Sequence, residues 1–377
     1  MALNTATDIS ISLCTTREAM QDHVEAWQAL MPHVAEDNIN YAPAPFFALL
    51  DANGAEGVSV AFIWRDGILI GVWPLQFGKA YHTPIQHIST YYDSSHMMSS
   101  VPLLRLGHTE DAVYALLNWI HEDIGAALFS VAEVTGKSDI ARQIDAAATA
   151  LGFSHERYRQ SARAILQKSD QAFEDYFLAH TSGKRRNALR RKRKKLASQG
   201  DWQLRYFGPA AVQAATSPDG IQGSPDWRPL LDDLIQVEAK SWKAAHGSAI
   251  ALNAPIQDFI LALCDYAAQH DQLYLIAAYL DDKPIAAQLG LINDHEIMIY
   301  KLGFDEDYKS LSPGLVLMYD MVEHAMHAEP PLGIDSCGDP KIRLYSETLH
   351  QARELWKSRY ATPAWRARAL HRGIQVA

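Results

Sequence analysis

Three side chains in the second half of the sequence are of types that transfer protons. Asp335 ends an apolar stretch, where it could work as a general base or could hold a loop by accepting backbone N–H groups. Glu238 is a second candidate base, and its alternative is a surface position on a helix near Lys243. Tyr300 could act as an acid or could pack in the core. We take Asp335, Tyr300 and Glu238 as the candidate catalytic residues.

A Ser-Pro-Gly sequence beginning at Ser312 predicts a helix start that could bind phosphate. Ser312 is expected to cap the helix, Pro313 suits its first position, and apolar residues follow at helical spacing. Backbone N–H groups and the helix dipole favour phosphate charge at such a start, whereas the plain alternative is an ordinary helix cap. The candidate cofactor-binding residues are Tyr308, Ser310, Ser312, Pro313, Gly314 and Leu315.

Further polar residues could contact a substrate. Gln288 lies among apolar residues, where an unpaired amide is costly to bury, so it is either a site residue or a satisfied structural amide. Cys337 has no histidine placed to activate it and is expected to be a core residue. The spacing of histidines and cysteines predicts no metal site. The candidate substrate-binding residues are Tyr92, Asp93, Trp242, Gln288, Lys301 and Lys341, and the alternative for the Tyr92–Asp93 pair is a turn.

Apolar runs separated by short polar turns are expected to position most of these residues. Three runs between Leu273 and Phe304 predict a β-meander, followed by the helix from Pro313 and a short strand from Gly333. The segment IWRDGILIGVWPL in the first half is echoed by AYLDDKPIAAQLGL in the second. This echo predicts a tandem pair of similar α/β domains. We also expect a helix over 348–360.

Length and composition favour a folded protein of two domains. The chain has 377 residues, nearly half of them hydrophobic, and three widely spaced cysteines that indicate a reducing compartment. We predict an N-terminal domain at 1–168, a basic helical connector at 169–200 and a C-terminal domain at 201–377. No stretch reaches the roughly 18 apolar residues that span a bilayer, and the N-terminus lacks a secretory pattern, so we expect a cytoplasmic protein.

The connector holds the most biased segment, a basic helix capped by Ser182 in which nearly every residue from Lys184 to Lys195 is Lys or Arg. It is either a solvated helix, a clamp for phosphates of a nucleotide-linked, lipid-linked or donor ligand, or a nucleic-acid contact. The formal net charge of −10 argues against nucleic acid. Peripheral contact with a membrane stays open, and so does the oligomeric state.

An ordered set of short motifs resembles a known family. Glu238–Ala–Lys–Ser–Trp242–Lys243 resembles its E-x-x-SWK segment, and Pro284–Ile–Ala–Ala–Gln288 resembles its piA-a-q strand. Tyr300, Asp305–Glu–Asp–Tyr308, Ser312–Pro–Gly314 and Asp335–Ser–Cys–Gly338 resemble its Y-x₄-DE-x-Y-x₃-SPG block and its D-x-x-G end. The sequence is thereby similar, over about residues 20–345, to FemAB-like tandem acyltransferases of the GNAT superfamily, of the CelD/BcsL type.

The resemblance implies two tandem GNAT-like domains with mixed α/β sheets and transfer of an acyl group from acyl-CoA to an amine. Its context is a cell-envelope, exopolysaccharide or cellulose precursor such as an amino sugar. The alternatives are a transferase that uses aminoacyl-tRNA and a non-catalytic sensor of a phosphorylated ligand. The family carries a Tyr–Lys pair after the last glycine, whereas Asp339–Pro340–Lys341 follows Gly338 here. Lys341 could replace that lysine, but Pro340 changes the local backbone.

Overall fold

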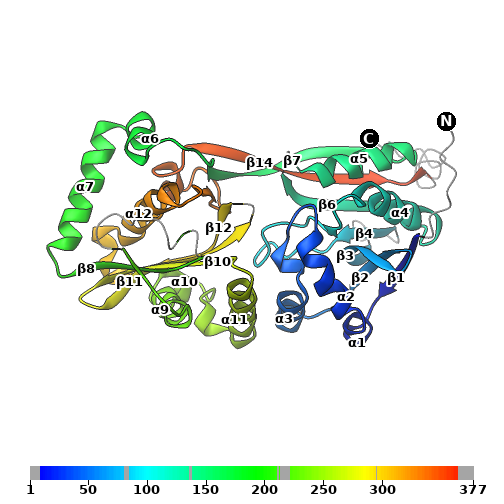
Figure 1. The fold of residues 1–377 in the computed structure, drawn as a ribbon, viewed down its shortest axis with the longest axis horizontal. Coiled ribbons are helices and arrows are strands. Elements are labelled where there is room, and N and C mark those ends of the chain that lie inside the picture. Colours follow the sequence, from blue (N-terminus) through cyan, green and yellow to red (C-terminus); the bar gives the residue numbers. More distant parts are fainter. Residues whose placement is uncertain are drawn as a thin grey trace. The chain divides into compact units, whose positions relative to one another are not determined.

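A computed structural model describes residues 9–79, 85–135, 138–209, 212, 221–293 and 295–363 (Figure 1). The chain divides into two compact units, each of which contains both strands and helices. Unit 1 comprises Met1–Ser161 and Glu354–Ala377, and unit 2 comprises Ala162–Arg353. The predicted fold class, mixed α/β in two tandem units, is confirmed.

The sheet of unit 1 runs in the order β1-β2-β3-β4-β6-β14, with β5 beside β3. Its pairings are antiparallel except that of β4 with β6. Figure 1 shows α4 and α5 over one face of this sheet and α1 to α3 over the other. The elements are β1 (Ile9–Cys14), α1 (Arg17–Gln21), α2 (Val24–Leu30), α3 (Pro43–Asn53), β2 (Val58–Arg65), β3 (Ile68–Lys79), β4 (Gln86–Thr90), β5 (Leu103–Leu104), α4 (Thr109–Glu122), β6 (Leu128–Thr135), α5 (Asp139–Ala150), β7 (Ser154–Leu166) and β14 (Gln351–Ala361).

The sheet of unit 2 runs in the order β7-β13-β12-β11-β10-β8-β9. β12 pairs with β13 in parallel, and the meander β10-β11-β12 is antiparallel, as predicted. Helix α12 covers one face of the meander and α9 the other (Figure 1). The elements are α6 (Phe173–His180), α7 (Gly183–Ala197), β8 (Trp202–Phe207), β9 (Ile221–Gly223), α9 (Arg228–Ala239), α10 (Trp242–Ala245), the 3₁₀ turns η4 (Ile250–Leu252) and η5 (Glu306–Leu311), α11 (Ala254–Gln269), β10 (Leu273–Leu280), β11 (Lys283–Asn293), β12 (Glu296–Phe304), α12 (Pro313–His327), β13 (Gly333–Asp335) and α13 (Arg343–Ser346).

The two echoed segments of the sequence form equivalent hairpins. The turn residues Asp66 and Gly67 have φ of 50° and 76°, and Asp281 and Asp282 have φ of 50° and 61°. Two successive left-handed residues match the twist of a tight hairpin. In each hairpin the strand register also shifts by a residue close to the turn. The same turn and the same irregularity at corresponding places support the tandem interpretation.

The final strand corrects one prediction. Residues 348–360 were expected to form a helix, which is wrong, because β14 pairs in antiparallel register with β6. Tyr360 is buried in the core of unit 1 and its hydroxyl donates to Asp145 Oδ1 at 2.6 Å. β14 begins at the end of unit 2 and completes the sheet of unit 1, so the compact units have limits other than the predicted domain boundaries.

No single helix in the described ranges is long and apolar enough to cross a bilayer, whereas one bent pair, Trp242–Leu252 with Ala254–Gln269, passes on length and composition.

Candidate functional site

The parallel strands β12 and β13 diverge in the middle of unit 2. Their parallel pairing extends only from Glu296 to Met298, because β13 ends at Asp335 while β12 continues to Phe304. On the other side of β12, Leu289 pairs with Lys301 and Gly290 with Ile299, so Tyr300 is the extra residue of a β-bulge. Bulges redirect side chains and are common beside active sites. Tyr300 therefore lies where the sheet departs from regularity.

Helix α12 begins directly after η5, the turn that follows β12. Ser312 adopts the left-handed conformation (φ 55°, ψ 54°) and Pro313 occupies the first helical position. The side chain of Ser312 does not cap the helix, which corrects that prediction. Its hydroxyl instead accepts a hydrogen bond from Lys192 Nζ at 2.5 Å. A Cβ atom at Gly314 would lie 3.3 Å from the Phe304 ring, so the small residue lets the helix start approach the end of β12.

The basic helix α7 supplies that lysine and is anchored along α12. Burial and the charge of Arg343 lower the pKa of Lys192, while Glu347 acts in the opposite direction. Arg193 on the same helix lies 3.3 Å from Asp320 and 3.8 Å from Glu323, both on α12. Lys192 was not among the residues singled out from the sequence, since within a run of like residues nothing marks one lysine as different. Its hydrogen bond to Ser312 distinguishes Lys192 from the other basic residues of α7.

The turn η5 is fixed by a buried carboxylate. Asp305 is 1% exposed; its Oδ1 accepts the backbone N–H of Asp307 at 3.0 Å and its Oδ2 lies 3.3 Å from Lys283 Nζ. Lys283 also lies 4.8 Å above the ring of Tyr308. Ser310 is exposed at the end of the same turn. The predicted cofactor-binding residues from Tyr308 to Leu315 thus form one continuous corner between β12 and α12.

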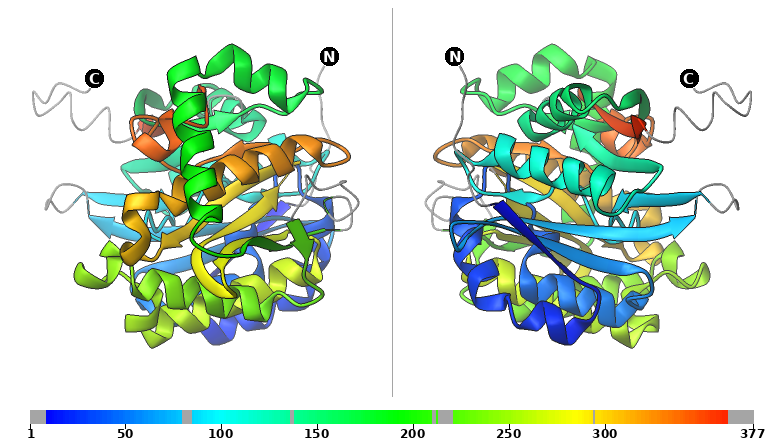
Figure 2. Two further views of the ribbon diagram at one scale, coloured as in Figure 1. Left: turned by 90° about the vertical axis from the view of Figure 1, so that its left-hand side faces the viewer. Right: turned by 90° about the vertical axis from the view of Figure 1, so that its right-hand side faces the viewer.

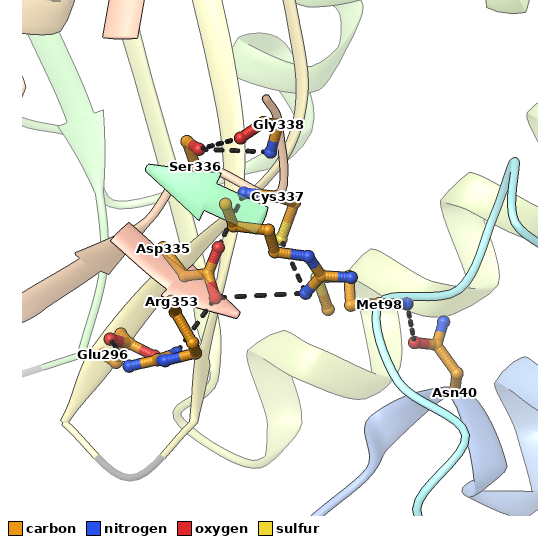
Figure 3. Close-up of polar contacts among 9 residues, drawn as sticks. Asn40, Met98, Glu296, Asp335, Ser336, Cys337, Gly338 and Arg353 are labelled. Atoms are coloured by element: carbon orange, nitrogen blue, oxygen red, sulfur yellow. Dashed lines mark hydrogen bonds and ion pairs between the residues drawn. The ribbon is translucent and has the colours of Figure 1, made fainter. Parts of the chain in front are cut away.

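Asp335 is held by arginines at the end of β13. It is 1% exposed; its Oδ1 accepts the Cys337 backbone N–H at 2.8 Å, and its Oδ2 accepts Arg353 Nη1 at 2.9 Å (Figure 3). Arg353 also donates to both oxygens of Glu296. Arg163 Nη1 lies 3.9 Å from Asp335. Both carboxylate oxygens are engaged, as the loop-holding alternative requires.

The loop after Asp335 also accounts for Cys337. Its backbone is left-handed (φ 50°), and burial followed by the charge of Asp335 raises the pKa of its thiol. A thiol with a raised pKa is a poor nucleophile at neutral pH. In the same turn, the Ser336 hydroxyl donates a hydrogen bond to the Gly338 carbonyl at 3.0 Å and accepts one from the Gly338 N–H at 3.1 Å (Figure 3). Lys341 is exposed, and its backbone N–H donates to Asp339 Oδ1 at 2.8 Å.

Glu238 is buried rather than on the helix surface, which corrects the alternative considered for it. Its side chain is 1% exposed and accepts from Lys243 Nζ at 2.5 Å and from the Ile250 N–H at 2.8 Å. Lys243 also donates to the Leu302 carbonyl at 2.8 Å, two residues beyond the bulge in β12. The sequence contained both charges, but the bend between α9 and α10 that brings them together was not evident. Glu238 and Lys243 therefore tie α9 and α10 to β12.

The candidate substrate residues are dispersed. Trp242 is 51% exposed on α10, and Lys301 Nζ lies 5.2 Å from the ring of Tyr300. Gln288 is 1% exposed on β11; its amide nitrogen lies 3.7 Å from Met318 Sδ, and its oxygen has no hydrogen-bond partner among the residues described. A buried amide oxygen without a hydrogen-bond partner destabilises the folded protein unless a ligand or a water molecule donates a hydrogen bond to it.

The remaining two candidates, Tyr92 and Asp93, lie in unit 1. Asp93 accepts from His96 Nδ1 at 2.9 Å, from the Ser95 N–H at 2.8 Å and from Asn53 Nδ2. Burial opposes ionisation, but the bonds from His96 and Ser95 outweigh it and lower the pKa of Asp93. These contacts are those of a turn-forming aspartate, the alternative considered from the sequence. Within the described ranges, His, Cys, Asp and Glu nowhere gather in a group of three or more able to hold a metal ion.

Known proteins show similarity to this fold. The crystal structure of a conserved protein of unknown function from Bacteroides thetaiotaomicron VPI-5482 aligns at 15% identity over 94% of this chain and 100% of that chain, with a TM-score of 0.50. The C-terminal domain of a proposed lysylphosphatidylglycerol synthetase from Agrobacterium fabrum aligns at 14% identity over 93% and 95%, with a TM-score of 0.50. At such identities these alignments show a shared fold only. FemX aligns at 12% identity over 89% and 95%, with a TM-score of 0.48.

Comparison with curated proteins found no match to this sequence. Comparison with protein-family models did find a match, and the matched residues include α7, the meander, α12 and β13. Residues 183–339, the part of the chain that contains the bulged strand and the start of α12, match the family described as "Acetyltransferase (GNAT) domain".

Proposed function

We propose that this protein is an N-acyltransferase that moves an acyl group from acyl-CoA to an amine. The observation that carries the proposal is the corner at Ser312–Gly314, where the start of α12 meets the bulged strand β12 and the ammonium group of Lys192. A GNAT-family match over residues 183–339 supports the reaction class. Acetyl-CoA and longer acyl-CoA thioesters are both compatible donors.

The donor's phosphates would lie at the start of α12. Pro313 has no N–H, and the N–H groups of Leu315 and Val316 donate to the Ser312 carbonyl. The Gly314 N–H and the helix dipole therefore favour negative charge there. Lys192, already bonded to Ser312, would add a charge-assisted contact. Because Gly314 has no side chain, a phosphate could approach the backbone, whereas a larger residue would crowd Phe304. The pantetheine arm would then run along β12 toward the bulge.

Acyl transfer needs the amine to attack the thioester carbonyl, an oxyanion to form, and a thiolate to leave with a proton. Tyr300, at the bulge, is our candidate for donating that proton to the departing sulfur. Asp335 and Glu238 each have both carboxylate oxygens engaged, so we assign them to positioning β13 and β12. The proton lost by the attacking amine would pass to solvent water.

We propose an amino sugar or a similar cell-envelope precursor as the acceptor, because the sequence motifs resemble those of acyltransferases that act in that context. Trp242, Lys301 and Lys341 are candidates for contacting it in unit 2, and Gln288 offers its unpaired carbonyl oxygen. Tyr92 and Asp93 are the candidates in unit 1. An anionic precursor would suit the two lysines.

Calorimetric titration with acetyl-CoA and a longer acyl-CoA tests the donor site. We expect saturable binding to the native protein, abolished by Gly314→Glu, which adds bulk and negative charge at the corner. Lys192→Met should weaken binding by roughly 10- to 100-fold, the loss of one charge-assisted hydrogen bond. Gly78→Glu is the matched control, because a Cβ atom at Gly78 meets nothing within 4 Å.

The titration separates the competing functions. Equal binding by the native protein and both site variants would move the donor away from α12. Absence of binding for either thioester would overturn the acyl-CoA assignment and direct the search to aminoacyl-tRNA or to a ligand sensor. Steep dependence of RNA binding on salt would then support the tRNA donor.

A further inference from the structure

The outer face of helix α7 carries a row of exposed cations. Because an α-helix turns by about 100° per residue, the five basic side chains on this face fall within an arc of roughly 140°. The row is about 16 Å long at 1.5 Å per residue. No ion pair or side-chain hydrogen bond to any of the five is found in the described part of the chain. We call this row the α7 stripe; its members are Lys184, Arg190, Arg191, Lys194 and Lys195.

The opposite face of the helix fixes the direction in which the stripe points. Leu196 is fully buried in a cluster with Val316 of α12. Lys192 donates to Ser312, and Arg193 pairs with Asp320. Figure 2 shows α7 crossing on the outside of α12, consistent with these contacts. The helix cannot turn about its axis without breaking them, so the cations are held outward as a group.

An exposed apolar side chain lies beside α7. Leu178 on α6 is 53% exposed, and its carbonyl accepts a hydrogen bond from Arg186 of α7 at 3.3 Å. Cations with a neighbouring exposed apolar side chain match an anionic lipid surface, where the charges meet headgroups and the apolar group enters the interface.

A nucleic-acid partner fits the same face less well. Proteins that hold single strands add aromatic side chains on which bases stack. The stripe has no aromatic member, so a base would find no ring to stack on along this face.

We propose that the α7 stripe binds the anionic phospholipid headgroups of a membrane surface. This proposal is independent of the acyl-transfer proposal, since it uses the outer face of α7 while the donor corner uses the inner face. It gives α7 two roles: its inner side supports the start of α12, and its outer side makes a peripheral contact with lipid.

Vesicle co-sedimentation at low ionic strength tests the proposal. The full-length protein is mixed with vesicles of phosphatidylcholine alone or with about one third phosphatidylglycerol. The stripe variant is Arg191→Gln/Lys194→Gln/Lys195→Gln. Each cation near an anionic surface contributes roughly fivefold to binding, so this variant should partition about 100-fold less onto anionic vesicles.

The matched control changes the net charge by the same amount elsewhere. Ala251→Glu/Leu252→Glu/Gln257→Glu adds three negative charges at exposed positions around the start of α11, as the stripe variant removes three positive ones. We expect the control to bind vesicles like the native protein, and thermal melting confirms that all three proteins are folded. A Leu178→Ser variant should bind several-fold more weakly without a change in charge.

Three results would overturn the proposal. One is equal partitioning of the native protein and the stripe variant onto anionic vesicles. Another is equal binding of the native protein to neutral and anionic vesicles. The third is retention by a short RNA duplex, lost in the stripe variant, without binding to anionic vesicles. Failure of acyl-CoA binding would leave the vesicle result unaffected.

Discussion

Replacing Asp320 by asparagine should make unit 2 more stable at neutral and alkaline pH. Asp320 lies on α12 and is 1% exposed, and neither of its carboxylate oxygens has a hydrogen-bond partner in the described ranges. Burial raises its pKa from 3.8 to about 7, although the attraction of Arg193 opposes the shift. Arg193 approaches to 3.3 Å but is itself 39% exposed, so it compensates the buried charge only in part.

The sign of the effect follows from proton linkage. Between about pH 4 and pH 7 the folded protein keeps a proton on Asp320 that the unfolded chain has lost, so the free energy of unfolding falls as pH rises through this window. A shift of about three pH units corresponds to about 4 kcal/mol at roughly 1.4 kcal/mol per unit. Asparagine cannot ionise, so the Asp320→Asn variant escapes this loss.

Thermal melting of both proteins at pH 5 and pH 8 measures the difference. About 2.7 kcal/mol of this difference falls between pH 5 and pH 7. At 2–4 °C per kcal/mol for a unit of this size, the variant should therefore gain roughly 5–11 °C relative to the native protein on going from the acidic to the alkaline buffer. Asp258→Asn on α11 is the matched control, because it removes the same charge from an exposed position. A gain that does not change with pH, or that is larger at pH 5, would refute the reasoning.

Two further substitutions probe the support of β12 and its chemistry. Lys243→Met leaves the Glu238 carboxylate buried without its cation and should lower the free energy of unfolding by about 3 kcal/mol, whereas the double variant Glu238→Gln/Lys243→Met should recover most of it. Urea titrations measure the free energy of unfolding of both variants. A Lys243→Met protein as stable as the native protein would contradict the prediction. Tyr300→Phe should lower kcat by about 100-fold or more with donor affinity unchanged if Tyr300 protonates the leaving thiolate. Unchanged turnover in a steady-state assay would remove Tyr300 from the mechanism.

Local patterns in the sequence predicted the elements whose form depends on neighbouring residues. The meander from Leu273 to Phe304 followed from apolar runs and acidic turns, and its turn residues have the left-handed conformations that such turns require. The helix from Pro313 followed from apolar spacing and a residue suited to the first position. These features are set by interactions within a few residues along the chain, so the sequence alone is sufficient to predict them.

The tertiary structure decided what depends on distant partners. β14 is a strand because β6, more than two hundred residues earlier, provides its hydrogen-bonding edge. Ser312 accepts a bond from Lys192 instead of capping its own helix, and Glu238 is buried because the bend after α9 places Lys243 over it. The cations of α7 divide into an anchoring inner face and an exposed stripe only because α12 covers one side. Composition fixes how much charge a helix carries, but packing determines which charges remain in water.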